Sequence, residues 1–146
     1  MKNDTLELKH DLVIMGIAVR TDPTRAATDL PALWQRFSAE HGEGPVYAVY
    51  CDYESDHAGP YTLVLGRELA VDKTVPTGKR RVRIPAGQYA RFKAAGDPKQ
   101  VIGKTWQHIN GAWEKKHQRR YIADFERYVG APKADGSIEA EILVGL

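Results

Sequence analysis

The chain has 146 residues, 42% of them hydrophobic and 27% charged, which is typical of a single globular domain with a core of its own. Its 21 Lys and Arg residues against 19 Asp and Glu give a net charge of +2, which is too balanced to indicate a nucleic-acid-binding protein. Because no apolar run is long enough to span a bilayer and the N-terminus lacks a signal-peptide core, we expect a cytoplasmic protein of one domain, residues 1–146, that contacts neither membrane nor nucleic acid directly.

The first half of the chain, about residues 11–70, predicts the order strand, helix, strand, strand. Apolar residues at helical spacing predict the helix, with Thr28 or Asp29 as its N-cap and Pro31 in its first turn. Runs rich in apolar, β-branched and aromatic residues predict the strands, and the last two should form a hairpin. The predicted ranges are 12–20 for the first strand, about 30–42 for the helix, and 45–53 and 61–65 for the hairpin.

The second half, about residues 80–146, follows a connector at about 72–78 and predicts the same order of elements. Asp97 followed by Pro98 is a typical helix start. The apolar positions of this helix, spaced by four, three and four residues, are Ile102, Trp106, Ile109 and Trp113. The predicted strands cover 81–85, 88–92, 121–129 and 138–146.

The two halves resemble each other in residues as well as in the order of elements. Residues 16–20 correspond to 87–91 at an offset of 71, and residues 33–37 correspond to 105–109 at an offset of 72. A repeat of this length is too long for a solenoid, so it favours two equal halves related by a pseudo-twofold axis. We expect an α+β fold of duplicated β-α-β-β halves, with an antiparallel sheet and two main helices around a central cleft that could hold a small ligand.

The strand at 121–129 carries the most informative residue, Glu126, because it sets a carboxylate among aromatic side chains. Alternation along the strand puts Asp124 and Tyr128 on the same face as Glu126. A carboxylate walled by apolar groups either stays neutral or meets a cation, which makes Glu126 a candidate binding residue. The alternative is a carboxylate that points into solvent.

Matching positions in the first half and on the helices add further candidates. At an offset of 74, Asp52 corresponds to Glu126. Tyr50 and Asp52 would therefore bring a second tyrosine and a second carboxylate toward the same axis. Trp106 and Trp113 share one face of the second helix, and Phe37 belongs to the matching stripe of the first; core packing is the alternative for all three. Aromatic faces with a carboxylate suit a flat, apolar cation, because the rings supply stacking and cation–π attraction and the acid supplies the counter-charge.

Other chemistries have weaker support. The five histidines form no i, i+4 pair with an acid, so no metal site is predicted, and no phosphate loop or dinucleotide motif predicts a cofactor. The one cysteine, Cys51, excludes an internal disulfide and is expected to be a buried, inert thiol. Two basic runs, 79–83 and 115–120, could bind a polyanion, but a solvated surface is the simpler interpretation because acids balance the total charge.

Several segments together carry a family resemblance that covers roughly residues 10–146. The segments are 47–50, 52–56, 84–90, Trp106 with Ile109 and Trp113, and above all 124–128. In order and spacing they resemble the GyrI-like family, also called AraC-type effector-binding domains. The resemblance implies two β-α-β-β halves around a ligand cleft, with an acid at the position of Glu126 meeting cationic ligands.

The resemblance also bears on how the domain would be used. Many members follow a DNA-binding domain, but only about ten residues precede the first predicted strand, so a stand-alone binding module is expected. Similar free-standing members include proteins carried on mobile gene cassettes. Others hydrolyse strained, cyclopropane-containing genotoxins, and in such a protein Glu126 would direct the attacking water.

Three functions remain open. The first is binding of cationic amphipathic or aromatic compounds, for drug sensing or sequestration, with Glu126 neutralising the charge. The side chains expected to line that site are Tyr50, Tyr89, Trp106 and Tyr128, with Phe37 and Trp113 beyond them. The second is hydrolysis with Glu126 as general base, its pKa raised by apolar walls. The third is an adaptor that binds a regulatory protein through Arg80, Arg81 and Arg83; free sheet edges would also allow a homodimer.

Overall fold

The computed structural model describes residues 1–70 and 73–146, so Asp72, where the predicted connector begins, lies outside the described residues. The elements are β1 (Asp4–Leu8), β2 (Leu12–Thr21), α1 (Ala26–Phe37), β3 (Val46–Cys51), β4 (Tyr61–Glu68), β5 (Arg80–Ile84), β6 (Gly87–Gly96), α2 (Pro98–Asn110), the short 3-10 helix η1 (Lys116–Gln118), β7 (Ala123–Tyr128) and β8 (Ile138–Gly145). Each predicted strand and helix has a counterpart, and the α+β class is confirmed. The strand β1 was not predicted, because its charges alternate with single apolar residues.

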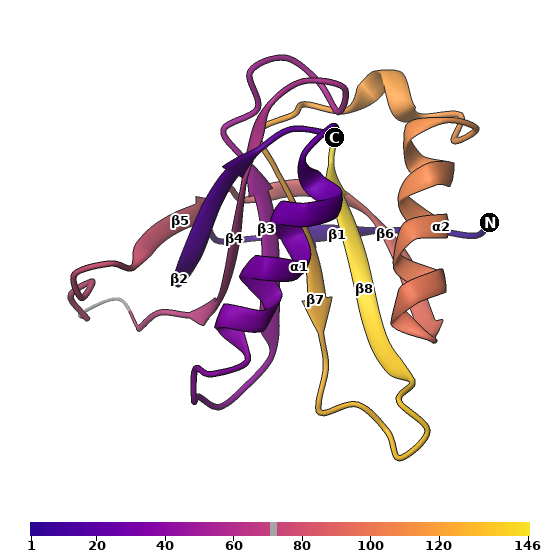
Figure 1. Cartoon of the computed structure of the whole chain (residues 1–146). Coiled ribbons are helices and arrows are strands. Elements are labelled where there is room, and N and C mark those ends of the chain that lie inside the picture. Colours follow the sequence, from indigo (N-terminus) through magenta and orange to yellow (C-terminus); the bar gives the residue numbers. More distant parts are fainter. Residues whose placement is uncertain (71–72) are drawn as a thin grey trace.

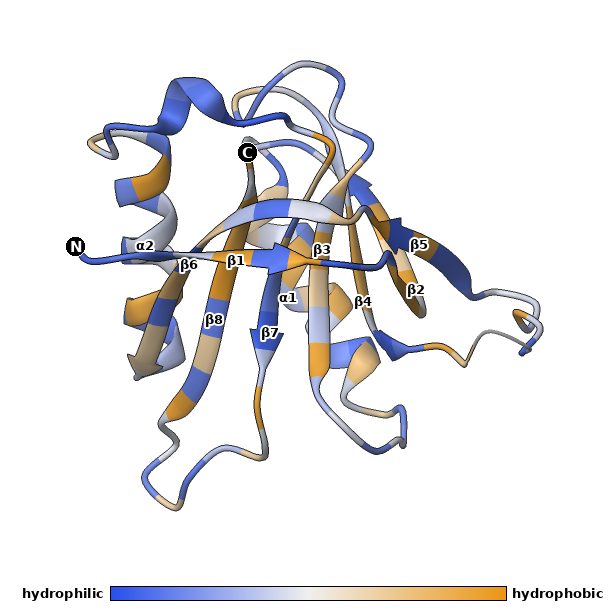
Figure 2. Ribbon diagram, turned by 180° about the vertical axis from the view of Figure 1, so that it is seen from behind, coloured by the Kyte–Doolittle hydropathy of each residue, from blue (hydrophilic) through white to orange (hydrophobic). Residues whose placement is uncertain are grey.

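The strands form one antiparallel sheet of eight strands in the order β1-β6-β8-β7-β3-β4-β2-β5. Outward from the centre the order is β3-β4-β2-β5 on one side and β7-β8-β6-β1 on the other, which is compatible with the predicted duplication. Two strands lie on the side of the sheet formed by the other half of the chain: β1, which precedes the first predicted half, pairs with β6, and β5, which opens the second half, pairs with β2. The sequence pattern did not predict this exchange. Figure 2 shows β1 running across the face of the curled sheet that is turned away from the helices.

The two helices begin differently. Asp97 caps α2 as predicted, because its carboxylate accepts a hydrogen bond from the Lys99 amide at 3.1 Å. The predicted start of α1 is wrong. The carboxylate of Asp22 accepts the amides of Thr24 and Arg25, so the helix begins at Ala26 and Pro31 lies inside it.

Asp29, one of the predicted caps, has another role. Its carboxylate accepts the Thr21 hydroxyl at 2.8 Å and thereby ties α1 to the end of β2. Neither helix of the described residues has the length and hydropathy needed to cross a bilayer.

Three apolar clusters position the site. One fills the curled side of the sheet, where Tyr47, Phe125 and Tyr89 pack together; Cys51 belongs to it, and burial raises the pKa of that thiol to about 12. The other two lie under the helices, one beneath α1 and one beneath α2. Figure 1 shows both helices on the same side of the sheet. Each helix therefore covers its own half and leaves the central strands β3 and β7 between them.

Candidate functional site

Glu126 lies on β7 in the space between the two helices. Its side chain faces the helix side because alternation along β7 turns its neighbour Phe125 into the opposite core. The pairing of β3 with β7 puts Ala48 directly opposite Glu126. The small alanine leaves room above the sheet for larger side chains on either side of it.

Three neutral donors hold the Glu126 carboxylate. The Tyr50 hydroxyl and the Trp106 indole N–H each donate to Oε2 at 2.7 Å, and the Tyr128 hydroxyl donates to Oε1 at 2.6 Å. The residue as a whole is only 2% exposed. The predicted alternative of a carboxylate in free solvent is therefore wrong, and the predicted association of Glu126 with aromatic side chains is confirmed.

The carboxylate has donors but no counter-ion in the part of the chain that the structure describes. None of the ion pairs found among residues 1–70 and 73–146 involves Glu126. Burial raises the pKa of Glu126, and the hydrogen bonds from Tyr128, Tyr50 and Trp106 partly offset that rise. Burial also raises the pKa of both tyrosines, so each hydroxyl keeps its proton and remains a donor.

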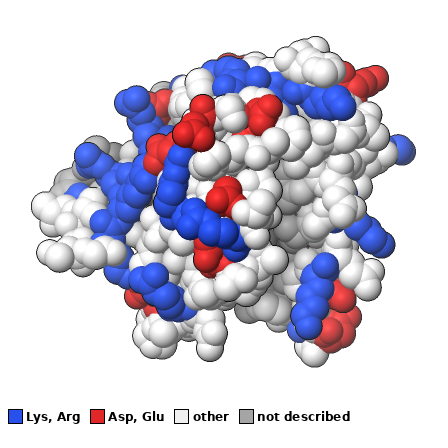
Figure 3. All heavy atoms as spheres, turned by 45° about the horizontal axis from the view of Figure 1, so that its top comes forward, with Lys and Arg blue, Asp and Glu red and all other residues white. Residues whose placement is uncertain are grey.

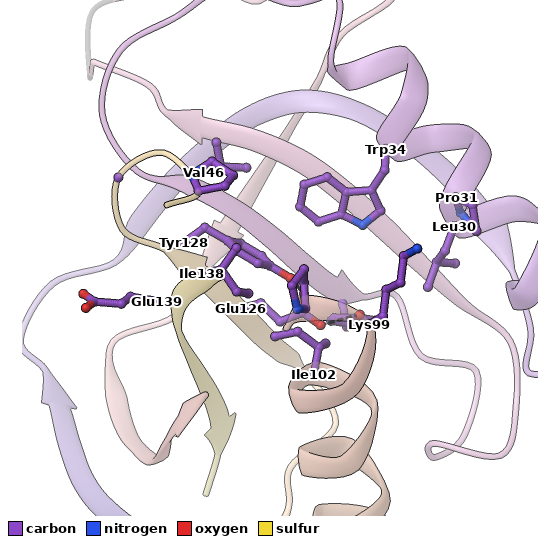
Figure 4. Close-up of a pocket in the computed structure, with 14 residues that line it drawn as sticks. Leu30, Pro31, Trp34, Val46, Lys99, Ile102, Glu126, Tyr128, Ile138 and Glu139 are labelled. Atoms are coloured by element: carbon purple, nitrogen blue, oxygen red, sulfur yellow. Dashed lines mark hydrogen bonds between the residues drawn. The ribbon is translucent and has the colours of Figure 1, made fainter. Parts of the chain in front are cut away.

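A cavity of about 580 Å³ opens above this carboxylate (Figure 4). Its walls come from α1, α2, the strands β3 and β7, the segment that follows β7 and the start of β8. The lining residues are Leu30, Pro31, Trp34, Val46, Tyr50, Pro98, Lys99, Ile102, Glu126, Tyr128, Gly130, Pro132, Ile138 and Glu139. The Trp34 ring meets Tyr128 edge to face, with the ring centroids 5.3 Å apart. The volume is that of a pocket for a drug-sized molecule.

A second buried carboxylate, Asp124, lies two residues before Glu126 and has a different environment. Its Oδ2 accepts Arg119 Nη2 at 2.9 Å and the Tyr53 hydroxyl at 2.7 Å, and its Oδ1 accepts the Gly145 amide at 2.9 Å. The side chains of the ion pair are 1% and 0% exposed. Asp124 is therefore fully partnered within the protein.

The prediction that Asp52 would be the second carboxylate at the axis is wrong. β3 ends at Cys51, and Asp52 adopts a left-handed backbone conformation with φ of 49°, so alternation does not continue through it. Its side chain pairs with Arg80 at 2.6 Å and is nearly half exposed.

The structure brings together three of the six predicted aromatic residues, Tyr50, Trp106 and Tyr128, around Glu126. Tyr89 was predicted wrongly: it lies on the opposite face of the sheet, where its ring packs against Phe125 at 5.6 Å and its hydroxyl donates to the Pro85 carbonyl.

The other two aromatic residues lie in the apolar cores under the helices rather than in the site. Phe37 is 8% exposed and supports Trp34 from below, with ring centroids 6.3 Å apart. Trp113 follows the end of α2 and packs in the core against Phe92 at 5.2 Å. Neither contributes to the cavity wall.

Trp34 lines the cavity with its aromatic ring, but it was not among the predicted site residues. It occurs in the same helical stripe as Phe37, and the repeat places it opposite Trp106. That correspondence was the available signal, because Trp106 was already a candidate.

The basic runs lie on the surface among acids. Figure 3 shows Lys and Arg side chains interspersed with Asp and Glu on the face that it presents. Arg80 pairs with Asp52, and Arg83 lies 3.6 Å from Asp11. Arg119, from the second run, is the buried partner of Asp124.

Known proteins share this architecture. An integron cassette protein from the mobile metagenome of Vibrio cholerae has a TM-score of 0.75 and 20% identity, over 98% of this chain and 94% of that one. The protein SAV2435, solved bound to tetraphenylphosphonium, has a TM-score of 0.79 and 14% identity, over 99% of this chain and 93% of that one. At these identities the likeness establishes the fold.

Sequence comparison is more specific. YobU of Bacillus subtilis (strain 168), provisionally named as a transcriptional regulator protein, is 29% identical over 136 residues, which cover 84% of this chain and 82% of YobU. The model of the integron-associated effector binding protein family, Cass2, matches residues 5–145. This agrees with the GyrI-like resemblance in the sequence, and the chain belongs to the integron-associated effector binding protein family.

Proposed function

We propose that the chain binds lipophilic organic cations with aromatic groups in the cavity between α1 and α2, with Glu126 as the counter-charge. One observation carries the proposal: a buried carboxylate has three neutral donors and no cationic partner among the described residues, at the floor of an apolar cavity. Binding of this kind would serve drug sensing or sequestration.

The physical reason is the cost of leaving a carboxylate charged in an apolar site. Hydrogen bonds from Tyr50, Trp106 and Tyr128 orient the group but leave its charge uncompensated. An organic cation restores neutrality, and its weakly hydrated apolar groups fit walls of aliphatic and aromatic side chains. The rings of Trp34 and Tyr128 add cation–π attraction.

The comparisons support the same class of ligand. The family is described as effector binding, and tetraphenylphosphonium, present in the SAV2435 structure, is an aromatic lipophilic cation. Tetraphenylphosphonium is therefore a reasonable probe for this chain.

The test is calorimetric titration with tetraphenylphosphonium and with tetraphenylborate, an anion of nearly the same size and shape. The wild type should bind the cation and reject the anion. Glu126→Gln should weaken cation binding by about 2 kcal/mol, roughly 30-fold, from Coulomb's law at an effective dielectric constant of about 20 and a separation of about 8 Å.

Glu68→Gln is the matched control, because Glu68 also accepts a tyrosine hydroxyl, from Tyr47, but takes no part in the cavity wall. Equal affinity of wild type and Glu126→Gln for the cation would refute the proposal. So would binding of the anion as tightly as the cation.

Hydrolysis is the second candidate, favoured by the raised pKa of the buried Glu126, which suits a general base near neutral pH. It predicts turnover of a strained cyclopropane electrophile that disappears in Glu126→Gln and persists in Glu68→Gln. Tight binding of tetraphenylphosphonium without turnover of any such electrophile would count against it.

A further inference from the structure

We infer that a second cavity, next to the first, takes a neutral hydrogen-bond-accepting group of the ligand, such as a carbonyl or ether oxygen. The inference rests on the proposed function and deepens it. The second cavity has a volume of about 240 Å³ and shares Leu30 and Tyr50 with the first. The polar side chains of Tyr53, Tyr61 and Asn110 form part of its remaining wall.

The protein's own contacts use three donors of this wall and leave others free. The hydroxyls of Tyr50 and Tyr53 and the indole N–H of Trp106 already donate to the carboxylates Glu126 and Asp124. The Tyr61 hydroxyl makes no hydrogen bond within residues 1–70 and 73–146, and its oxygen is accessible although the residue as a whole is only 8% exposed. It is therefore a donor available to a molecule in the second cavity.

Asn110 contributes a donor of defined orientation. Arg119 Nη1 lies 2.5 Å from Asn110 Oδ1, and a guanidinium can only donate, so the amide oxygen is the occupied side. Arg119 is itself fixed by Asp124 and lies 4.3 Å above the Tyr121 ring. The NH₂ group of Asn110 is consequently the side left for a ligand.

The two cavities thus differ in the chemistry they offer. The first presents a negative charge, the Glu126 carboxylate, without a cationic partner among the described residues and between largely apolar walls. The second presents donors, the Tyr61 hydroxyl and the Asn110 amide, beside an ion pair that is already neutral. A ligand that spans both would combine an aromatic cation with an oxygen-bearing tail, and the tail would add selectivity among cations.

The experiment uses two alkyltriphenylphosphonium cations with tails of equal length, one ending in a methyl ketone and the other in the isosteric isopropenyl group. Wild type should bind the ketone about fivefold more tightly, the effect of one neutral hydrogen bond. In Tyr61→Phe the ratio of the two affinities should fall to about one. It should also fall in Asn110→Asp, because the aspartate still accepts the hydrogen bond from Arg119 but has no N–H to donate. Tyr47→Phe, on the opposite face of the sheet, should keep the wild-type ratio.

Equal affinity of wild type for the two probes would overturn the inference while leaving the proposed function intact, provided both still bind through Glu126. A ketone preference that survives unchanged in Tyr61→Phe and Asn110→Asp would overturn it as well. Binding of both probes that is insensitive to Glu126→Gln would overturn the proposed function, and this inference with it.

Discussion

Raising the pH should strengthen binding of tetraphenylphosphonium and at the same time destabilise the ligand-free protein. Both effects follow from the charge of Glu126. Burial raises the pKa of this group above 4.5 in the free protein. A bound cation favours the charged carboxylate, so binding at a pH below the raised pKa must release one proton.

The magnitudes follow from linkage. Below the raised pKa, affinity should increase up to tenfold per pH unit, since one unit corresponds to about 1.4 kcal/mol between the two protonation states. Above it, affinity should reach a plateau. The stability of the ligand-free protein changes with pH in the opposite direction. The contribution of Glu126 to the free energy of unfolding is fully present below a pH of about 4.5. It is lost as the pH rises through the raised pKa of the folded protein, by up to about 1.4 kcal/mol per pH unit.

Titration calorimetry in two buffers of different ionisation enthalpy counts the proton directly. The heat should differ between buffers at acidic pH and agree on the plateau. In Glu126→Gln the affinity should be weak and free of this pH dependence. A wild-type affinity that is constant with pH, or the same slope in Glu126→Gln, would refute the assignment of the proton to Glu126.

Three further changes test separate parts of the site. Trp34→Ala should weaken tetraphenylphosphonium binding by about 1–2 kcal/mol in the same titration, because the cation loses an aromatic wall. Lys99→Met should strengthen it roughly twofold at low salt, since Lys99 lines the cavity and repels a cation, and the gain should vanish in high salt. Arg119→Met should lower the free energy of urea unfolding by about 3–5 kcal/mol, because it leaves Asp124 buried without a counter-ion; adding Asp124→Asn should restore part of that loss.

The sequence predicted which segments are helix or strand better than how those segments begin and end. Asp29 precedes an apolar helical run and is typical of an N-cap, yet its carboxylate bonds the Thr21 hydroxyl and Asp22 orders the start of the helix instead. Local pattern does not distinguish these two acids, because the difference depends on where the end of β2 meets α1. The exchange of β1 and β5 between the halves also depends on contacts far apart in sequence.

Contacts between segments far apart in the sequence also decide which predicted residues reach the site. Tyr50 and Tyr89 both lie in strands rich in apolar residues, but the pairing of β3 with β7 brings Tyr50 to Glu126, whereas Tyr89 faces Phe125 in the other core. Trp34 and Phe37 share a helical stripe and are separated by only about 4.5 Å of helix rise. The rotation of α1 on the sheet decided that the first forms the cavity wall and the second its support. The aromatic neighbours of Glu126 were predictable from its own strand, whereas its burial was not, because alternation does not tell which face of a sheet the helices cover.

The two acids of β7 make the clearest internal comparison. Asp124 and Glu126 lie two residues apart on the same face, and both are almost completely buried. Asp124 is neutralised by Arg119, whose position the protein fixes through Asn110 and the Tyr121 ring. Glu126 also has three donors, but all of them are neutral, and no cation pairs with it among the described residues. Since both carboxylates are removed from water, Glu126 differs from Asp124 in having no positive partner among residues 1–70 and 73–146, and under the proposed function the ligand would supply that charge.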